Sequence, residues 1–446
     1  MPGPPGLPVV GNLPELARDP LAFFSRCARD YGDVVRFRVP GVTAYLLSHP
    51  DHIEDLLITQ RHNFIKGRAV QANRPLLGDG LLTSEGEDWL RDRRLVQPAF
   101  HRDRITGHAG LIVERTMQML SEWRDGQKCA IDRELSWLVQ EIAAQTLLGV
   151  DIGDALPEAR EAFGTCLAEF RAGMRTGFLV PAGVPTPGNL RLRRAVGRLD
   201  AIVYRVIAER RAHLDEEGDR PDMLTLLLRS MQEQEQAVPQ GDRRLRDEVV
   251  TLFVAGHETT GIALTFTCYL LARHPAVQAQ LLAELEARLD GRLPTAADLP
   301  LLPFTQMVIK EALRLYPPAW ALVRTAIRDC EIGGQRLRAG DSVTVSQWVL
   351  HHDARYFARP YQFEPERWAA PGPLDLPRFA YFPFGGGPRG CIGEGLALLE
   401  LGLIVATIVP RFGFELTSAR DLELLPSITL RPRDSVEVRL TKRRGP

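Results

Sequence analysis

The chain has 446 residues, with 55 basic and 56 acidic side chains and a formal net charge of −1. Nucleic acids and anionic membrane surfaces select strongly basic proteins, so this balance indicates no nucleic-acid partner and no membrane-surface partner. The length alone suggests about three domains. However, Gly and Pro cluster only at 2–14, 181–188 and 371–390, and these clusters read as loops rather than as interdomain tethers.

The six cysteines form no CxxC pair and are widely scattered, which favours a reduced, cytoplasmic protein. No apolar run approaches the length that a bilayer requires, and the N-terminus lacks a charged-then-apolar signal pattern. We therefore predict a soluble protein without a membrane span. The abundance of Ala, Arg and Leu is typical of a bacterial genome of high GC content.

The predicted elements are mainly helical. Period-2 alternation predicts strands at 33–39 and 43–48, and short apolar runs predict further strands near 331–345 and 412–440. Long amphipathic stretches between about 104 and 290 predict helices. The fold class predicted is mainly α with a smaller β region.

Trp89 and Arg93 lie four residues apart in a polar stretch, so on a helix both side chains face the same way. Further on, the apolar segment from about 245 to 273 predicts a long helix with a polar patch. Gly256 and nearby threonines weaken the helical ladder there, because a threonine hydroxyl can bond the carbonyl one turn back and open a groove. Taken alone, this patch is equally typical of a core helix with a solvated or ion-paired glutamate.

Glu311 and Arg314 share one face of the next predicted helix, which Pro317 and Pro318 end. Most such pairs are solvated surface ion pairs. His351 and His352 are expected to be structural, because adjacent residues of a strand point to opposite faces and no third metal ligand is spaced nearby. His257 is likewise not expected to be a ligand.

Cys391 ends a glycine-rich run that starts at residue 384, and an apolar segment with a helical pattern follows it. Glycines let backbone N–H groups approach a sulfur atom, and a helix N-terminus and the Arg389 cation both favour negative charge there. This arrangement is typical of a thiolate that ligates iron. The alternative is a buried structural cysteine after a tight turn.

Three motifs in this order resemble those of the cytochrome P450 monooxygenases. The patch from Ala255 to Thr260 is similar to the family's oxygen-binding helix, and the pair Glu311 and Arg314 is similar to its buried ion pair. The residues that match the cysteine-loop signature are Phe384, Gly385, Gly387, Arg389, Cys391 and Gly393. The resemblance implies one domain over residues 1–446, folded as a helical triangular prism with a smaller β-rich region.

The resemblance also implies roles for individual residues. Cys391 would ligate the iron of haem b, and Glu258 and Thr259 would deliver protons to dioxygen. Arg367 would join Glu311 and Arg314 in a structural cluster. The side chains expected to bind the haem propionates are Trp89, Arg93, Arg324 and Arg389, and the other residues expected to bind the cofactor are Ala255, Gly256, Phe384 and Gly393.

The segments that line the family's pocket are apolar here, which predicts an apolar substrate. The resemblance also implies that Trp320 lies above the haem, where its bulk would narrow the cavity. Residues 74–101 look most like actinobacterial terpene hydroxylases, so a terpenoid such as a cyclic sesquiterpene is predicted first and a fatty acid or steroid second. The residues expected to contact the substrate are Leu81, Phe178, Val254, Ala319, Trp320, Val323 and Ile428.

The chain ends about fifty residues after the cysteine loop without a flavin or iron–sulfur module. We therefore expect a monomer that receives electrons from a separate ferredoxin or flavodoxin with an NAD(P)H-dependent reductase. A haem-thiolate isomerase or peroxide-driven enzyme, and a haem-binding sensor or carrier without turnover, remain alternatives. The adjacent acid and threonine, Glu258 and Thr259, favour the monooxygenase.

Overall fold

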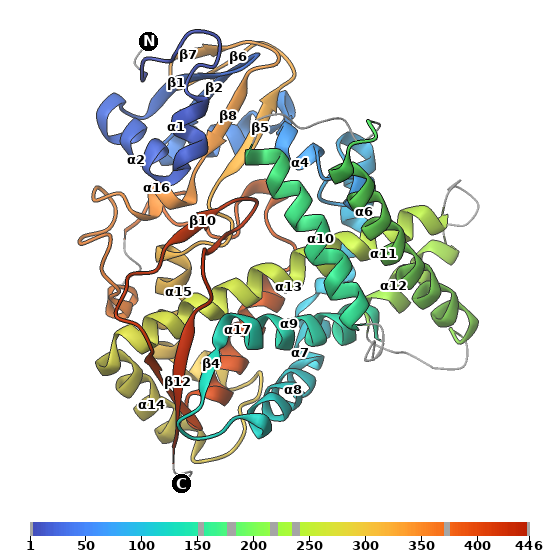
Figure 1. Ribbon diagram of the computed structural model, residues 1–446, viewed down its shortest axis with the longest axis vertical. Helices are drawn as coiled ribbons and strands as arrows, with labels where there is room; N and C mark the ends of the chain where they lie inside the picture. Colours follow the sequence, from blue (N-terminus) through green and yellow to red (C-terminus); the bar gives the residue numbers. More distant parts are fainter. Residues whose placement is uncertain are drawn as a thin grey trace. The chain divides into compact units, whose positions relative to one another are not determined.

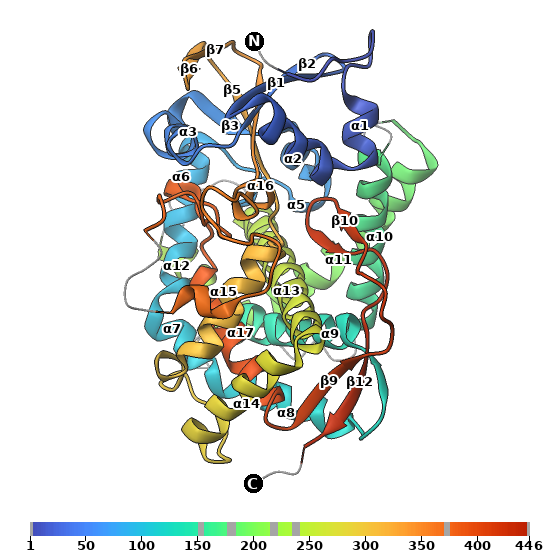
Figure 2. The ribbon, with the colours of Figure 1, turned by 90° about the vertical axis from the view of Figure 1, so that its left-hand side faces the viewer.

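The computed structural model describes residues 3–149, 156–175, 184–214, 222–233, 241–369 and 375–443. The chain divides into two compact units. The first consists of Met1–Ile65, Ile105–Val139 and Glu258–Pro446, and the second consists of Lys66–Arg104 and Gln140–His257. Figures 1 and 2 show the course of the chain, which is mainly helical with a smaller β part, as the sequence predicts.

The helices and strands have the following bounds. The α-helices are α1 (Leu13–Arg18), α2 (Pro20–Tyr31), α3 (Pro50–Glu54), α4 (Arg68–Gln71), α5 (Arg74–Leu77), α6 (Gly86–Val96), α7 (Arg102–Gly107), α8 (Ala109–Glu122), α9 (Ile131–Leu148), α10 (Leu156–Arg175), α11 (Pro187–Ala212), α12 (Met223–Glu233), α13 (Gly241–Arg273), α14 (Pro275–Leu289), α15 (Pro303–Leu315), α16 (Gln347–His351) and α17 (Glu394–Ile408). The short π and 3-10 helices are η1 (Asp55–Thr59), η2 (Arg61–Asn63), η3 (Gln97–Phe100), η4 (Leu299–Leu301), η5 (Pro365–Trp368) and η6 (Gly387–Arg389). The strands are β1 (Val34–Val39), β2 (Val42–Leu47), β3 (Phe64–Lys66), β4 (Lys128–Ala130), β5 (Leu322–Ala326), β6 (Cys330–Ile332), β7 (Gln335–Leu337), β8 (Ser342–Val345), β9 (Phe412–Leu416), β10 (Leu424–Pro426), β11 (Leu430–Pro432) and β12 (Glu437–Lys442).

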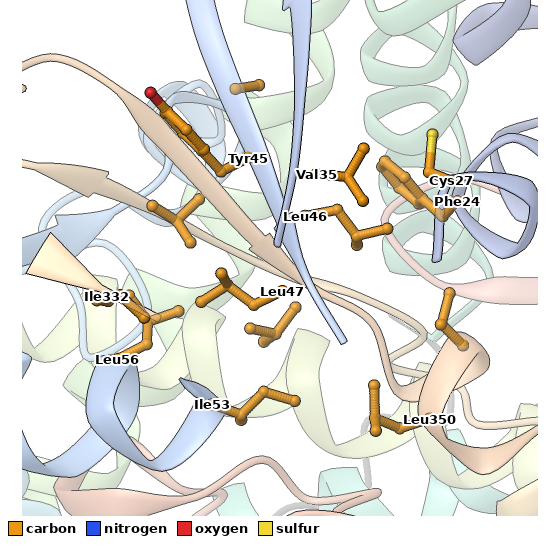
Figure 3. Close-up of a cluster of buried hydrophobic side chains, with 14 of the residues drawn as sticks. Phe24, Cys27, Val35, Tyr45, Leu46, Leu47, Ile53, Leu56, Ile332 and Leu350 are labelled. Atoms are coloured by element: carbon orange, nitrogen blue, oxygen red, sulfur yellow. The ribbon is translucent and has the colours of Figure 1, made fainter. Parts of the chain in front are cut away.

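The main sheet has the strand order β1-β2-β8-β5-β3. β1 and β2 form an antiparallel hairpin, β2 runs parallel to β8, and β8 runs antiparallel to β5. Apolar side chains of α2, of the hairpin and of α3, η1, β6 and α16 form one buried cluster, and Figure 3 labels ten of its residues. Phe24 and Val35 are 5% and 0% exposed, so burial of this apolar surface stabilises the sheet that carries β5.

α13 is the longest helix described, at 33 residues, and begins at Gly241 rather than near residue 245. By length and composition it is apolar enough to cross a membrane, so the sequence-based statement that no run approaches that length was wrong. In the most apolar 18-residue stretch of this helix, 67% is buried inside the protein. A core helix has this character too, because an apolar helix can bury all its faces in protein.

Glu311 and Arg314 on α15 are both fully buried. Arg314 donates to both carboxylate oxygens of Glu311, at 2.9 and 2.8 Å. Arg367 Nε donates to Glu311 Oε1 at 2.9 Å, and Trp368 Nε1 donates to Oε2 at 2.9 Å. The structure thus brings together the three residues predicted to form a cluster, with the Trp368 indole as a fourth member. α15 ends at Leu315, just before Pro317, as predicted.

His351 and His352 lie on a helix and at its C-cap, not on a strand, so the argument from strand geometry was wrong. The helix α16 is only five residues long and begins after Ser346, whose side chain caps Val349 N–H. His351 Nε2 accepts a hydrogen bond from Phe382 N–H at 3.1 Å. Burial lowers the pKa of His352 to about 3, so its ring is neutral at physiological pH.

We predict that Glu311→Gln lowers the free energy of unfolding by about 3–5 kcal/mol, because two buried guanidinium groups would lose their counterion while the side chain keeps its shape. Chemical denaturation followed by far-UV circular dichroism measures the change. The matched control is Asp329→Asn, since Asp329 pairs with Arg336 at 3.3 Å on the surface and its loss should cost less than about 1 kcal/mol. Equal effects of the two substitutions would contradict a structural role for Glu311.

Candidate functional site

The loop that carries Cys391 has a fixed backbone. Cys391 N–H donates to Phe384 O at 2.9 Å, and Gly390 N–H donates to Gly387 O at 3.0 Å. Gly385 and Gly387 have φ values of +71° and +68°, which disfavour any residue with a side chain. A Cβ atom at Gly387 would also collide with the carbonyl oxygen of Leu57. The turn therefore requires glycine at these positions.

Cys391 differs from the other cysteines in its exposure. Its side chain is exposed, whereas Cys27, Cys129, Cys166 and Cys268 are buried. Burial raises the pKa of Cys27 and of Cys129 to about 12 and that of Cys166 to about 11. These buried thiols remain protonated and cannot serve as metal ligands without a large cost. Cys330 is half-buried, so the most exposed of the six cysteines is the one that the glycine-rich loop presents.

α17 starts shortly after Cys391, with Gly393 at its N-cap, and its residues 399–408 are all buried. The residues around its start differ, because Ile392 before the helix and Leu396 in its first turn are half-buried and Leu398 is 38% exposed. Apolar side chains that are partly exposed beside an accessible thiol form a suitable surface for a flat apolar group. The N-terminus of α17 also directs the positive end of its dipole toward this region.

β5 lies next to the cysteine loop, because a Cβ atom on Gly385 would be 3.5 Å from Leu322 Cδ1. Arg324 on this strand is half-buried, and its Nη1 donates to Val323 O at 3.1 Å. Ala319 and Val323 are half-buried as well. The first unit thus brings Arg324, Arg389 and Cys391 onto neighbouring segments, as required if two guanidinium groups are to bind carboxylates beside the thiol.

Trp320 packs in the hydrophobic core, where its ring centroid is 6.1 Å from that of Phe24. Its Nε1 donates to Ser427 O at 2.9 Å, and only 9% of the residue is exposed. Ile428, the next residue of that turn, is 39% exposed. A direct contact of Trp320 with substrate remains a prediction.

The polar patch of α13 is part of one continuous α-helix, so the predicted weakening of the ladder near Gly256 does not interrupt it. Ala255 is exposed, and Val254, Gly256, Glu258 and Thr259 are half-buried. A short accessible strip therefore runs along a helix that is otherwise largely buried. A strip with a small residue, an acid and a hydroxyl suits the binding of a small oxidant together with proton transfer.

His257, in the same patch, is buried. It lies within 4.9 Å of the rings of Phe163 and Phe253, and its Nδ1 is 2.7 Å from Phe253 O. Burial lowers its pKa to about 4, so the ring is neutral. These contacts account for His257 as a core residue.

Glu258 contacts a hairpin near the C-terminus. Its Oε1 accepts a hydrogen bond from Thr429 Oγ1 at 3.1 Å and lies 4.0 Å from Arg431 Nη1. Sequence reasoning missed both partners. Their separation of more than 170 positions from Glu258 leaves no local spacing signal, although Thr429 and Arg431 alternate with apolar residues in a predicted strand region.

Glu400 was also missed. It is 3% exposed in the middle of apolar α17 and hydrogen-bonds to Thr260, the residue after Thr259. Burial raises its pKa to about 8, so the carboxyl group is largely neutral at pH 7. A lone acid in a long apolar run is the sequence signal that could have indicated it.

Besides Val254, Ala255 and Gly256 on α13, three predicted residues that the structure describes belong to the second unit, and one further predicted residue lies outside the described residues. Trp89 and Arg93 are half-buried on α6, one turn apart. Leu81 is 9% exposed, and its N–H donates to Glu248 Oε2 at 3.2 Å. Phe178 falls in the part of the chain that the structure does not describe.

Comparison with known proteins supplies the family. The family model for cytochrome P450 matches residues 1–437. The chain belongs to the cytochrome P450 family. It is a haem-binding oxidoreductase, a monooxygenase, with the fold of that family.

This chain is 38% identical over 414 residues to cyclooctat-9-en-7-ol 5-monooxygenase of Streptomyces melanosporofaciens. The match covers 92% of this chain and 88% of the relative. Pentalenene oxygenase of Streptomyces avermitilis is 31% identical, with 99% of this chain and 97% of the relative covered. The crystal structure of the cytochrome P450DA haem domain superposes with a TM-score of 0.88 at 28% identity and covers 100% of this chain and 98% of that one.

Cytochromes P450 bind haem b through a cysteine thiolate. The residues of the first unit fit this group, because the exposed Cys391 thiol, the partly exposed apolar turn of α17 and two nearby guanidinium groups supply a ligand, a flat apolar contact and partners for propionates. Haem b is therefore the cofactor, while the assignment of each contact remains a proposal.

We predict that Glu400→Gln flattens the pH dependence of stability. The folded pKa of about 8 lies above the ordinary value of 4.5, so the stability from this neutral carboxyl is fully present below about pH 4.5 and is lost as the pH rises through about 8. Glutamine stays neutral, so the unfolding temperature of the variant should decline less between pH 5 and 8.5. Burial also raises the pKa of Glu248 to about 8. Because both proteins contain Glu248, part of the decline in unfolding temperature should remain in both.

The exposed Glu415 on β9 provides the control, since Glu415→Gln should leave the wild-type slope unchanged. If Glu400→Gln and the wild type decline in parallel, Glu400 is not held neutral in the folded protein.

Proposed function

We propose that this cytochrome P450 inserts one oxygen atom of dioxygen into a C–H bond or double bond of a cyclic terpenoid. The observation that carries the substrate class is the similarity to the two relatives whose names specify cyclooctat-9-en-7-ol and pentalenene. The half-buried apolar residues Val254, Ala319 and Val323 support an apolar substrate. A fatty-acid or steroid hydroxylase is the second candidate.

The overall reaction consumes one substrate molecule, dioxygen, two electrons and two protons, and it yields the oxygenated product and water. When bound, the haem supplies the oxygen-activating chemistry, and its thiolate ligand favours cleavage of the O–O bond. We propose that Cys391 holds the iron and that Trp89, Arg93, Arg324 and Arg389 bind the propionates. The other proposed cofactor contacts are Ala255, Gly256, Phe384 and Gly393.

We propose that Glu258 and Thr259 move the protons. The Glu258 side chain is 15% exposed, so its carboxylate can exchange protons with water, and Thr259 follows it on the accessible strip of α13. A carboxylate that reaches solvent and an adjacent hydroxyl form a short path for protons along the helix. The adjacent buried residues His257 and Thr260 exclude water from the rest of this turn.

Members of the family use dioxygen, a substrate and redox partner proteins. For this chain we propose a separate ferredoxin or flavodoxin with an NAD(P)H-dependent reductase as the electron source. We further propose a cytoplasmic monomer without a membrane span, in which residues 1–446 form one domain. The burial of most of the apolar part of α13 supports the absence of a membrane span.

Titration of the purified haem protein with a panel of ligands tests the substrate class. Pentalenene and cyclooctat-9-en-7-ol should shift the Soret band from the low-spin to the high-spin position. Both should bind at least about tenfold more tightly than lauric acid or progesterone, a difference of ~1.4 kcal/mol. Tighter binding of the fatty acid or of the steroid would favour the second candidate instead.

A further inference from the structure

The hairpin of β10 and β11 touches the proposed proton-relay carboxylate. Thr429 Oγ1 donates to Glu258 Oε1 at 3.1 Å, and Arg431 Nη1 lies 4.0 Å from the same oxygen. The Thr429 residue is 6% exposed, and the side chains of Glu258 and Arg431 are 15% and 23% exposed. A hydroxyl donor and a cation therefore meet the carboxylate where little water competes with them.

The hairpin is itself firmly held. β10 and β11 pair antiparallel, with Leu425 opposite Arg431, and Figure 2 shows this ribbon in dark red under the label β10. Leu430 N–H donates to Pro318 O at 2.9 Å, and Trp320 Nε1 donates to Ser427 O at 2.9 Å. Because both ends of the turn are bonded to the segment before β5, Thr429 occupies a defined position.

One hairpin thus carries two functions. Its turn presents Ile428, which is 39% exposed and predicted to contact substrate, and the next residue binds Glu258. A displacement of the turn that changes the pocket wall would also move the donor of the carboxylate.

We propose that Thr429 and Arg431 are positioning residues for Glu258. They hold its carboxylate at the outer edge of α13, where it takes up protons from water for transfer toward Thr259. This inference rests on the proposed relay role of Glu258. It assigns to the hairpin a part in proton delivery in addition to its place in the pocket wall.

The position of Glu258 should determine the products of turnover. In productive turnover, substrate, dioxygen, two electrons and two protons give the oxygenated product and water. When proton delivery is misdirected, dioxygen, two electrons and two protons leave as hydrogen peroxide, and the substrate is not oxidised. The ratio of hydrogen peroxide released to NADPH consumed therefore measures how well Glu258 is positioned, with no need for a product standard.

The central experiment compares Thr429→Val with Thr429→Ser in the haem-loaded enzyme. Valine keeps the volume and branching of threonine but removes the hydroxyl, whereas serine keeps the hydroxyl. Pentalenene serves as the probe, and a surrogate ferredoxin with its NADPH-dependent reductase supplies electrons. We expect Thr429→Val to raise the peroxide ratio about threefold to tenfold, and Thr429→Ser to stay near wild type. The effect should be smaller than the roughly 10²- to 10⁴-fold that a proton-transfer side chain itself contributes, because Thr429 only positions that side chain.

Arg431 is tested in parallel. Arg431→Gln should raise the peroxide ratio and Arg431→Lys should restore most of the coupling, because lysine keeps the cation. Arg433 is the matched control on the same hairpin, since its Nε pairs with exposed Glu423 at 3.1 Å. Arg433→Gln should leave the ratio unchanged, and all variants should keep the wild-type spin-state shift with the probe.

Glu258→Gln and Thr259→Ala separate failure of this inference from failure of the proposed relay. Both should release peroxide. If they do and Thr429→Val and Arg431→Gln remain coupled, the positioning role is wrong and the relay stands. If Glu258→Gln itself stays coupled, the relay role of Glu258 is wrong, and the positioning inference is overturned with it.

Discussion

Access to one sulfur atom, that of the proposed iron ligand Cys391, is the constraint on which the site of this cytochrome P450 depends. Cys391 lies at the end of a loop whose backbone bends through Gly385 and Gly387, and its N–H is fixed to Phe384 O. The helix that follows is almost wholly buried, but its first turn is not. A side chain at Gly387 would strike the carbonyl of Leu57, so the loop depends on neighbouring segments as well as on its own sequence.

Three glutamates of the first unit lie in different environments. Glu311 is shared by two guanidinium groups and an indole N–H, whereas Glu400 is held neutral by burial on α17. Glu258 retains a cation and a hydroxyl as neighbours and some access to water. These are three different environments for one residue type. They fit a structural cluster for Glu311, a neutral core contact for Glu400 and the proposed proton relay for Glu258.

The sequence predicted what local chemistry determines. Positive φ at the loop glycines, the end of α15 before Pro317 and the shared face of Glu311 and Arg314 all follow from spacing over a few residues. The strands β1 and β2 appeared where the alternating pattern predicted them. The sequence-based prediction of a strand at His351 and His352 was wrong, because the five-residue helix α16 is too short to show a helical period. Its start is set by the cap at Ser346.

Contacts between distant segments were not predictable in the same way. Nothing in the spacing of Thr429 or Arg431 indicates that they meet Glu258, because the meeting depends on how the hairpin is bonded to the segment before β5. The packing of Trp320 against Phe24 also follows from tertiary structure, since its indole could equally have faced a pocket. The family motifs indicated the candidate side chains, whereas the packing supplied the partners that orient them.

The most direct test of this account is the absorption difference spectrum of the haem-loaded, dithionite-reduced protein with and without carbon monoxide, recorded for the wild type and for Cys391→Ser. The wild type should show the strongly red-shifted Soret band of a thiolate-ligated ferrous complex, and Cys391→Ser should lose it. A red-shifted band in Cys391→Ser, or a band of neutral axial ligation in undamaged wild-type protein, would contradict the assignment of Cys391 as the iron ligand.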